Sequence, residues 1–274
     1  MSKNSLYGRG HVALQFELYT PGSSFLYRLD PRVKVLGVLV IFAISVIFTH
    51  PLFLGPFFFA ILLIDILGGV PLGKVALLLK SLALLVIISL VMWPLLYHPG
   101  TEILRYGPIY VTDIGLAYGV GMAFRILNMV IAPISLMLTT TQRDFILALR
   151  GLGLPHKGAF ALATTFRFVP TVVGVGQTII EAQKSRGLDV NQGRITTRMR
   201  KYSAILGPLI ISSLRLAQQL ALAVESKGLG STAKRTSIRR LQLTRMDYAV
   251  LGGYVVLLVL VILLRLRGVG AFHV

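Results

Sequence analysis

Two short segments of similar sequence carry the residues best suited to chemistry with a partner. Ala182–Leu188 and Ala223–Leu229 share the pattern A-x-x-S-[R/K]-G-L and lie 41 residues apart. Each closes a stretch compatible with a helix, so a cation occupies the last turn and a glycine follows it. Helix capping accounts for each glycine, but it does not require the flanking sequence to recur. A cation on a rigid helix end can also enter a groove on a partner and pair with carboxylates there.

The candidate contact residues are the central three of each copy: Ser185, Arg186, Gly187, Ser226, Lys227 and Gly228. A second interpretation is that this basic region lies on anionic lipid, where each Lys or Arg contributes ~1 kcal/mol near the surface. The two interpretations are compatible with each other.

One further motif suggests phosphate binding, but it is incomplete. Gly68–Lys74 fits the first seven positions of a phosphate-binding loop, yet Val75 stands where a Ser or Thr must bind magnesium. The motif also lies between two apolar runs, without the strand that normally precedes it. We therefore predict that the chain has no ATP site of its own.

The sequence predicts no catalytic residue, metal site or cofactor. The five histidines are scattered without ligand spacing, and the absence of cysteine excludes disulfides and thiolate chemistry. No set of acid, base and nucleophile occurs in the polar region 140–246. Asp65 and Arg125 are the notable charges within apolar runs, and such charges are functional candidates by default. Snorkelling to an interface, or pairing with each other, would explain them equally well.

Composition indicates an integral membrane protein. The chain has 274 residues, 55% of them hydrophobic, and a mean hydropathy of +0.77, with several apolar runs of transmembrane length. The net charge of +18 could suggest nucleic acid, but the charge is concentrated beside the apolar runs. Residues 140–246 hold 17 Lys or Arg against four acids, and such a block normally faces the cytoplasm. We therefore expect the lipid bilayer, and no nucleic acid, as a partner.

The elements that would position the twin motif follow from the order of these runs. Four predicted spans precede it: Val33–Phe48, Leu52–Leu67, Val75–Leu96 and Ile114–Leu138. The distribution of Lys and Arg between the loops predicts a cytoplasmic N-terminus in the cell membrane. The first 25 residues lack the apolar core of a cleavable signal peptide. A final span, Tyr248–Leu264, would leave the C-terminus outside, where Arg265 and Arg267 fit poorly.

The chain therefore divides into a cytoplasmic tail (1–29), a four-span membrane region (30–139), a cytoplasmic helical region (140–246) and a final span with its tail (247–274). In the third part, Thr141 and Asp144 resemble a capping box that opens a short helix. A helix rich in small residues covers 158–182. A hydrophilic linker, Arg194–Lys201, leads to an amphipathic helix of about 28 residues, roughly 42 Å long.

Four stretches resemble the transmembrane T component of energy-coupling factor (ECF) importers, which include the membrane subunits of cobalt, nickel and biotin uptake systems. They are Leu29–Lys34, Leu147–Pro155, Phe166–Pro170 and Glu181–Asp189. The resemblance implies two cytoplasmic coupling helices, each ending in an Arg-centred motif that docks on one of two ATP-binding cassette ATPase subunits. It also implies that another face holds a membrane-embedded, substrate-binding S component. The docking role falls on Arg186 and on Lys227, where the family usually has Arg.

The resulting prediction is an all-α polytopic membrane protein with about five transmembrane helices and cytoplasmic amphipathic coupling helices. It would be a non-enzymatic scaffold that transmits ATP-driven motion to an S component, for uptake of a vitamin or a transition-metal ion. The first alternative is a self-contained secondary carrier, which would transport when reconstituted alone. The second is an interfacial membrane enzyme, for which no catalytic set is visible. The sequence does not name the cargo.

Overall fold

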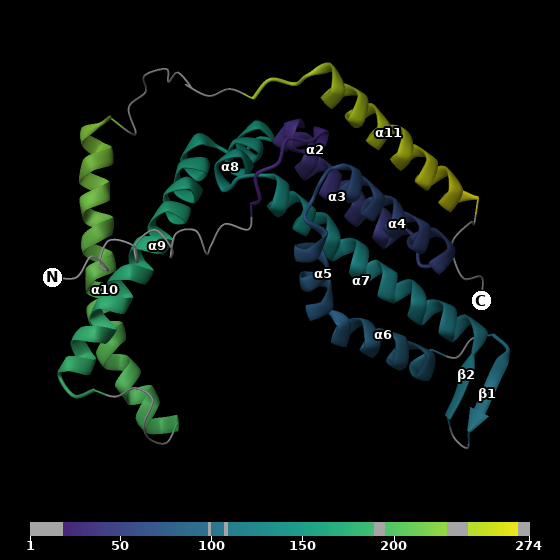
Figure 1. The fold of residues 1–274 in the computed structure, drawn as a ribbon, viewed down its shortest axis with the longest axis horizontal. Coiled ribbons are helices and arrows are strands. Elements are labelled where there is room, and N and C mark those ends of the chain that lie inside the picture. Colours follow the sequence, from purple (N-terminus) through teal and green to yellow (C-terminus); the bar gives the residue numbers. More distant parts are fainter. Residues whose placement is uncertain (1–18, 98–99, 107–108, 189–194, 229–240, 268–274) are drawn as a thin grey trace. The chain divides into compact units, whose positions relative to one another are not determined.

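The computed structural model describes residues 19–97, 100–106, 109–188, 195–228 and 241–267. These residues form two compact units, which are described separately. The core unit contains residues 19–155 and 241–267, and the two-helix unit contains residues 156–228. Nearly all of the described chain is helical, which confirms the all-α prediction (Figure 1).

The core unit consists of eight described helices and one hairpin. The helices are α2 (Phe25–Arg28), α3 (Pro31–Ile47), α4 (Pro51–Leu67), α5 (Leu72–Ser81), α6 (Ala83–Leu96), α7 (Asp113–Thr139), α8 (Gln142–Gly151) and α11 (Arg245–Leu266). Between α6 and α7, strands β1 (Glu102–Tyr106) and β2 (Ile109–Thr112) pair in antiparallel register, with Arg105 opposite Tyr110.

Local sequence explains where several helices begin. The Asp30 carboxylate accepts a hydrogen bond from the Arg32 backbone N–H at 2.9 Å, and Pro31 follows as the first residue of α3. Thr141 caps α8 by accepting from the Asp144 backbone N–H at 3.2 Å, as the sequence predicted. Each cap supplies an acceptor for a backbone donor that has no partner inside its own helix.

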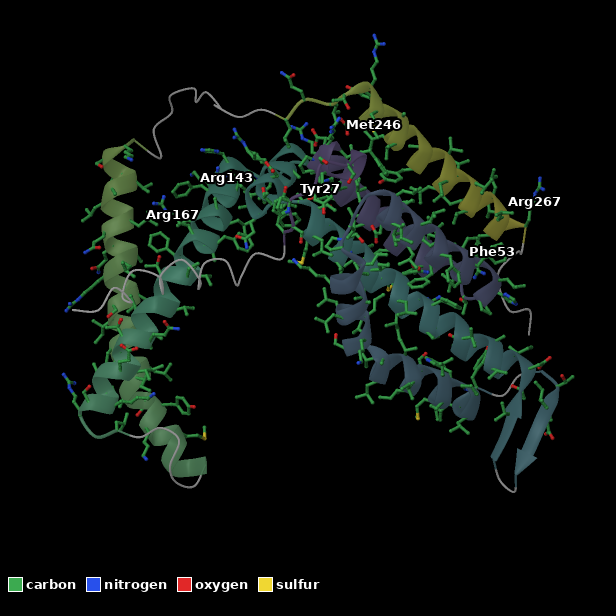
Figure 2. The ribbon with its side chains drawn as sticks, in the orientation of Figure 1. Tyr27, Phe53, Arg143, Arg167, Met246 and Arg267 are labelled. Atoms are coloured by element: carbon green, nitrogen blue, oxygen red, sulfur yellow. The ribbon has the colours of Figure 1, made fainter. Side chains whose placement is uncertain are left out.

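The long helix α7 organises the core unit. It packs against α3, α4, α5 and α6, and glycines allow the close approach. Gly119 faces Pro94 of α6, and Gly121 faces the Thr49 carbonyl in the turn between α3 and α4. Helix α11 runs along α3 on another side (Figure 1). Figure 2 marks its ends, with Met246 near the start and Arg267 just beyond the last residue.

The two-helix unit contains α9 (His156–Ser185) and α10 (Ile195–Ser226). The Gln183 side-chain amide, near the end of α9, donates to the Ala204 carbonyl, near the start of α10, at 3.2 Å. Thr165, in the first half of α9, and Leu220, in the last third of α10, line one cavity of about 310 Å³. The two helices therefore run antiparallel, and each one's end lies beside the other's beginning.

Length and composition agree with a multi-pass membrane protein. Four described helices are long and apolar enough to cross a bilayer: α7, α9, Lys201–Ser226 within α10, and α11. The pair α5 and α6 would make a fifth span that bends by 49°. Helices α3 and α4 have 17 residues each, so they measure about 26 Å. The prediction that α9 and α10 are cytoplasmic coupling helices stays a prediction.

Three features differ from the sequence-based prediction. The expected span Val75–Leu96 is two helices, because the backbone N–H of Leu82 bonds the Leu79 carbonyl at 3.0 Å and closes α5. The hairpin β1–β2 lies between the expected spans Val75–Leu96 and Ile114–Leu138, where no strand was predicted. Helix α10 begins at Ile195, so the expected linker Arg194–Lys201 is helical from that residue onward.

Candidate functional site

The end of α9 displays the first copy of the twin motif. The backbone N–H of Leu188 donates to the Gln183 carbonyl at 3.0 Å, and that of Gly187 donates to the Lys184 carbonyl at 2.9 Å. This pair of bonds is the Schellman arrangement, in which a left-handed residue satisfies the last free carbonyls. Gly187 has φ of +85°, which a side chain would make costly. The geometry holds Arg186 in the turn that ends the helix.

The end of α10 displays the second copy in the same way. Gly228 has φ of +69°, and its backbone N–H donates to the Glu225 carbonyl at 2.8 Å. The serine before each cation turns back onto its own helix: Ser185 donates to the Glu181 carbonyl at 3.1 Å. Ser226 donates to the Ala223 carbonyl at 3.0 Å. The recurring sequence therefore produces a recurring local structure at both helix ends.

All six predicted contact residues are exposed. Within the described part of the chain, the side chains of Arg186 and Lys227 have no hydrogen-bond or ion-pair partner. Both cations also sit at the negative ends of helix dipoles, where a positive charge stabilises the helix. Two solvated cations on rigid helix ends are free to bind acceptors on another molecule.

The antiparallel arrangement separates the two cations. Arg186 follows Gln183, whose amide contacts Ala204, so the first cation lies near the start of α10. Lys227 lies 23 residues beyond Ala204 along the same helix, a distance of roughly 35 Å at 1.5 Å per residue. The structure does not bring the two motif copies into one site. It places two similar exposed cations at opposite ends of one helix pair.

The two charges within the apolar runs have separate partners. The Asp65 carboxylate is 2% exposed and accepts from the Ser135 hydroxyl at 2.6 Å. The Arg125 guanidinium donates to the Phe48 carbonyl at 2.7 Å and to the Thr49 hydroxyl at 3.2 Å. Arg125 thus fixes the turn between α3 and α4 to α7. The alternative that Asp65 and Arg125 pair with each other is wrong.

A polar junction in the core unit was missed by sequence reasoning. The buried backbone N–H of Asp30 donates to the Asp247 carboxylate at 2.8 Å, which joins the starts of α3 and α11. The Lys34 ammonium donates to the Thr139 carbonyl at 3.0 Å and to the Thr140 hydroxyl at 3.4 Å, which joins α3 to the end of α7. A lysine one turn inside an apolar helix could have indicated this junction, because a buried charge needs hydrogen-bond acceptors.

The junction also brings together two of the stretches that carry the family resemblance. Gly151, at the end of α8, lies so close to Arg32 that a Cβ there would overlap the guanidinium. Arg32 belongs to Leu29–Lys34, and Gly151 belongs to Leu147–Pro155. The glycine therefore allows α8 to dock against the start of α3.

The turn that resembles a phosphate loop has a different local structure. Lys74 donates from its ammonium to the Thr20 hydroxyl at 2.8 Å. Val75 is 1% exposed and belongs to the hydrophobic cluster that includes Ile131 and Leu138. The lysine and the following residue thus serve the packing of α5 onto the core unit.

Comparison with known proteins identifies the family. Residues 22–238 match the family model described as cobalt transport protein, CbiQ. The chain is 30% identical over 259 residues to the energy-coupling factor transporter transmembrane protein EcfT of Bacillus subtilis (strain 168), covering 90% of this chain and 96% of that one.

Proteins with the same name from two other organisms are similarly related. That of Acidaminococcus fermentans is 32% identical over 258 residues (91% of this chain, 95% of the relative). That of Thermosediminibacter oceani is 31% identical over 242 residues (84% of this chain, 90% of the relative). The chain therefore belongs to the family of transmembrane proteins of energy-coupling factor transporters, and it is a T component of such a transporter.

Proposed function

We propose that this chain is the non-catalytic scaffold of an ECF importer, coupling ATP hydrolysis by two cytoplasmic ATPase subunits to the motion of an S component. The cargo would be a vitamin or a transition-metal ion. The observation that carries the proposal is the pair of exposed cations, Arg186 and Lys227, at opposite ends of the antiparallel helices α9 and α10. Two similar points about 35 Å apart suit two similar subunits better than one.

The helix pair offers a continuous path between those subunits and the membrane. Backbone hydrogen bonds run along each helix except at its internal proline, Pro170 in α9 and Pro208 in α10, so a displacement of one end is passed along the helix toward the other. Large apolar side chains also remain exposed on α10: Leu206, Ile210 and Leu214 recur at steps of four and are 52%, 57% and 58% exposed. Three large, exposed apolar side chains on one helix face favour a partner that covers them. The proposed partner is the membrane-embedded S component.

The proposal assigns no ATP site to this chain. The side-chain partner of Lys74 is Thr20, and Val75 is buried where a magnesium-binding hydroxyl would be needed. Both observations support placing ATP turnover on other subunits.

The experiment that tests the proposal is purification of the tagged chain from its native host. We expect ATP-binding cassette subunits and a small membrane protein to co-purify, and mass spectrometry of the latter would define the cargo class. The chain reconstituted alone should support neither ATP hydrolysis nor uptake of that cargo. Uptake driven by an ion gradient through the isolated chain would instead establish the secondary carrier.

A second experiment tests the proposed cytoplasmic position of α9 and α10. The chain has no cysteine, so single cysteines can replace Arg143, Gln192 and Ser237 without background. Figure 2 labels Arg143, which lies on α8, and Arg167, which lies on the following helix α9. All three cysteines should react with an impermeant thiol reagent only after the cells are opened. A cysteine at position 192 that reacts in intact cells, while one at 143 does not, would show that α9 crosses the membrane.

A further inference from the structure

The core unit contains a cavity of about 260 Å³ between α3, α4, α7 and α11. Charged and polar lining residues gather at one end of it: Lys34 near the start of α3, Asp65 near the end of α4, and Thr139 at the end of α7. Apolar walls continue from there to Ile41 and Phe57. Seven or eight helical residues correspond to about 10–12 Å. The cavity is thus polar at the helix ends and apolar along the helices.

The polar end has unused hydrogen-bonding capacity. Among the described residues, Ser135 is the one hydrogen-bond donor to the Asp65 carboxylate, although a carboxylate has about four acceptor positions. The Lys34 ammonium uses two of its three donors, on Thr139 and Thr140. An anionic acceptor and a cationic donor therefore line the same small space.

On the α4 side, the cavity is lined by exposed residues. Ala60 and Ile64, one helical turn apart, both line it and are both exposed. Their exposed neighbours Phe59 and Leu63 are apolar, as a surface in contact with lipid chains requires. A molecule that enters by this route comes from the bilayer.

We propose that this cavity binds one acyl chain of a membrane phospholipid whose headgroup carries a primary ammonium, as in phosphatidylethanolamine. The ammonium donates to the Asp65 carboxylate, and an ester or phosphate oxygen accepts the remaining Lys34 donor. The acyl chain lies along the apolar walls toward Ile41 and Phe57. The headgroup's ammonium suits the Asp65 carboxylate, and its oxygens suit the Lys34 ammonium. The cavity of about 260 Å³ is smaller than the ~300–1,000 Å³ of typical ligand pockets, so it takes part of one acyl chain and the rest of the lipid lies outside it.

A comparison of three phospholipids with different headgroups tests these contacts. Phosphatidylcholine carries the same charges, but its quaternary ammonium has no N–H to donate to Asp65. Phosphatidylglycerol supplies the phosphate without the cation. The purified protein, equilibrated in detergent with equal amounts of the three lipids and then washed, is analysed by native mass spectrometry. Phosphatidylethanolamine should be retained about tenfold over phosphatidylcholine, the effect of one charge-assisted hydrogen bond.

Three variants test the assignment of the site. Asp65→Asn keeps a partner for Ser135 but removes the charge, so the preference for phosphatidylethanolamine over phosphatidylcholine should disappear. Ala60→Phe fills the opening, so retained lipid should fall to the detergent background. Leu63→Phe adds a similar ring on an exposed face of the same helix, outside the cavity, and should behave as the unaltered chain does.

Several results would overturn the proposal. They are equal retention of the three lipids by the unaltered chain, preference for phosphatidylglycerol, a preference that survives Asp65→Asn, and retention that Ala60→Phe does not change. The comparison of lipids on the unaltered chain requires no substitution. It decides the question even if a variant fails to fold.

Discussion

Replacing both Arg186 and Lys227 by alanine is expected to detach the ATPase subunits from the complex while the helices stay folded. If each cation enters a groove on its own subunit, its removal leaves a buried acceptor unpaired and costs ~2–5 kcal/mol of binding. If the residues only cap helices, each substitution costs at most about 1 kcal/mol of local helix stability. In the first case, the amount of ATPase retained in a pull-down should fall by orders of magnitude. In the second case, it should stay nearly unchanged.

The two single substitutions should weaken ATPase binding to different extents. Arg186 can make a forked contact with two hydrogen bonds, whereas Lys227 offers a point charge. Arg186→Ala should therefore weaken binding more than Lys227→Ala, and Lys227→Arg should be tolerated. These contacts are charged, so the losses should depend on salt concentration.

A matched control is available on the same two helices. Lys157 and Arg215 are exposed cations on α9 and α10 that lie outside both copies of the twin motif. The double variant Lys157→Ala and Arg215→Ala removes the same net charge and should retain both ATPases. Retention of the ATPases and of cargo uptake by the Arg186→Ala and Lys227→Ala double variant would leave these residues as helix caps alone.

The second large effect concerns the packing of the core unit. A Cβ at Gly121 would overlap the Thr49 carbonyl in the turn between α3 and α4. That turn cannot move away freely, because Arg125 holds the Phe48 carbonyl and the Thr49 hydroxyl. Gly121→Ala should therefore destabilise the folded protein by about 1–3 kcal/mol, the usual cost of overpacking. The midpoint of thermal unfolding in detergent measures the loss.

Gly253→Ala provides the control of opposite sign. Gly253 lies inside α11, and a Cβ there meets no atom within 4 Å. Alanine at such a position loses less backbone entropy and should raise stability by roughly 0.5–1 kcal/mol. Equal unfolding midpoints for the two variants would mean that the close approach of α7 to the turn does not constrain the fold.

The sequence alone was sufficient where structure depends on neighbouring residues. Thr141 before Asp144 predicted the start of α8, because a cap and its backbone donor lie within three residues. The Asp30 cap at the start of α3 is equally local. Gly187 and Gly228 predicted two helix ends for the same reason, since a left-handed residue closes the turn that precedes it. The apolar runs likewise predicted the helical membrane class, and four stretches indicated the family.

The tertiary structure alone decided the features that depend on residues distant in the chain. Asp65 and Ser135 are 70 positions apart in the sequence, and Asp30 and Asp247 are 217 positions apart. No local sequence pattern therefore predicts either contact. The antiparallel pairing of α9 and α10 likewise depends on the contact between Gln183 and Ala204, and it places the twin cations at opposite ends of the helix pair. A helix cap is specified by the few residues that form it. The partner of a buried charge is specified only when packing brings distant helices together.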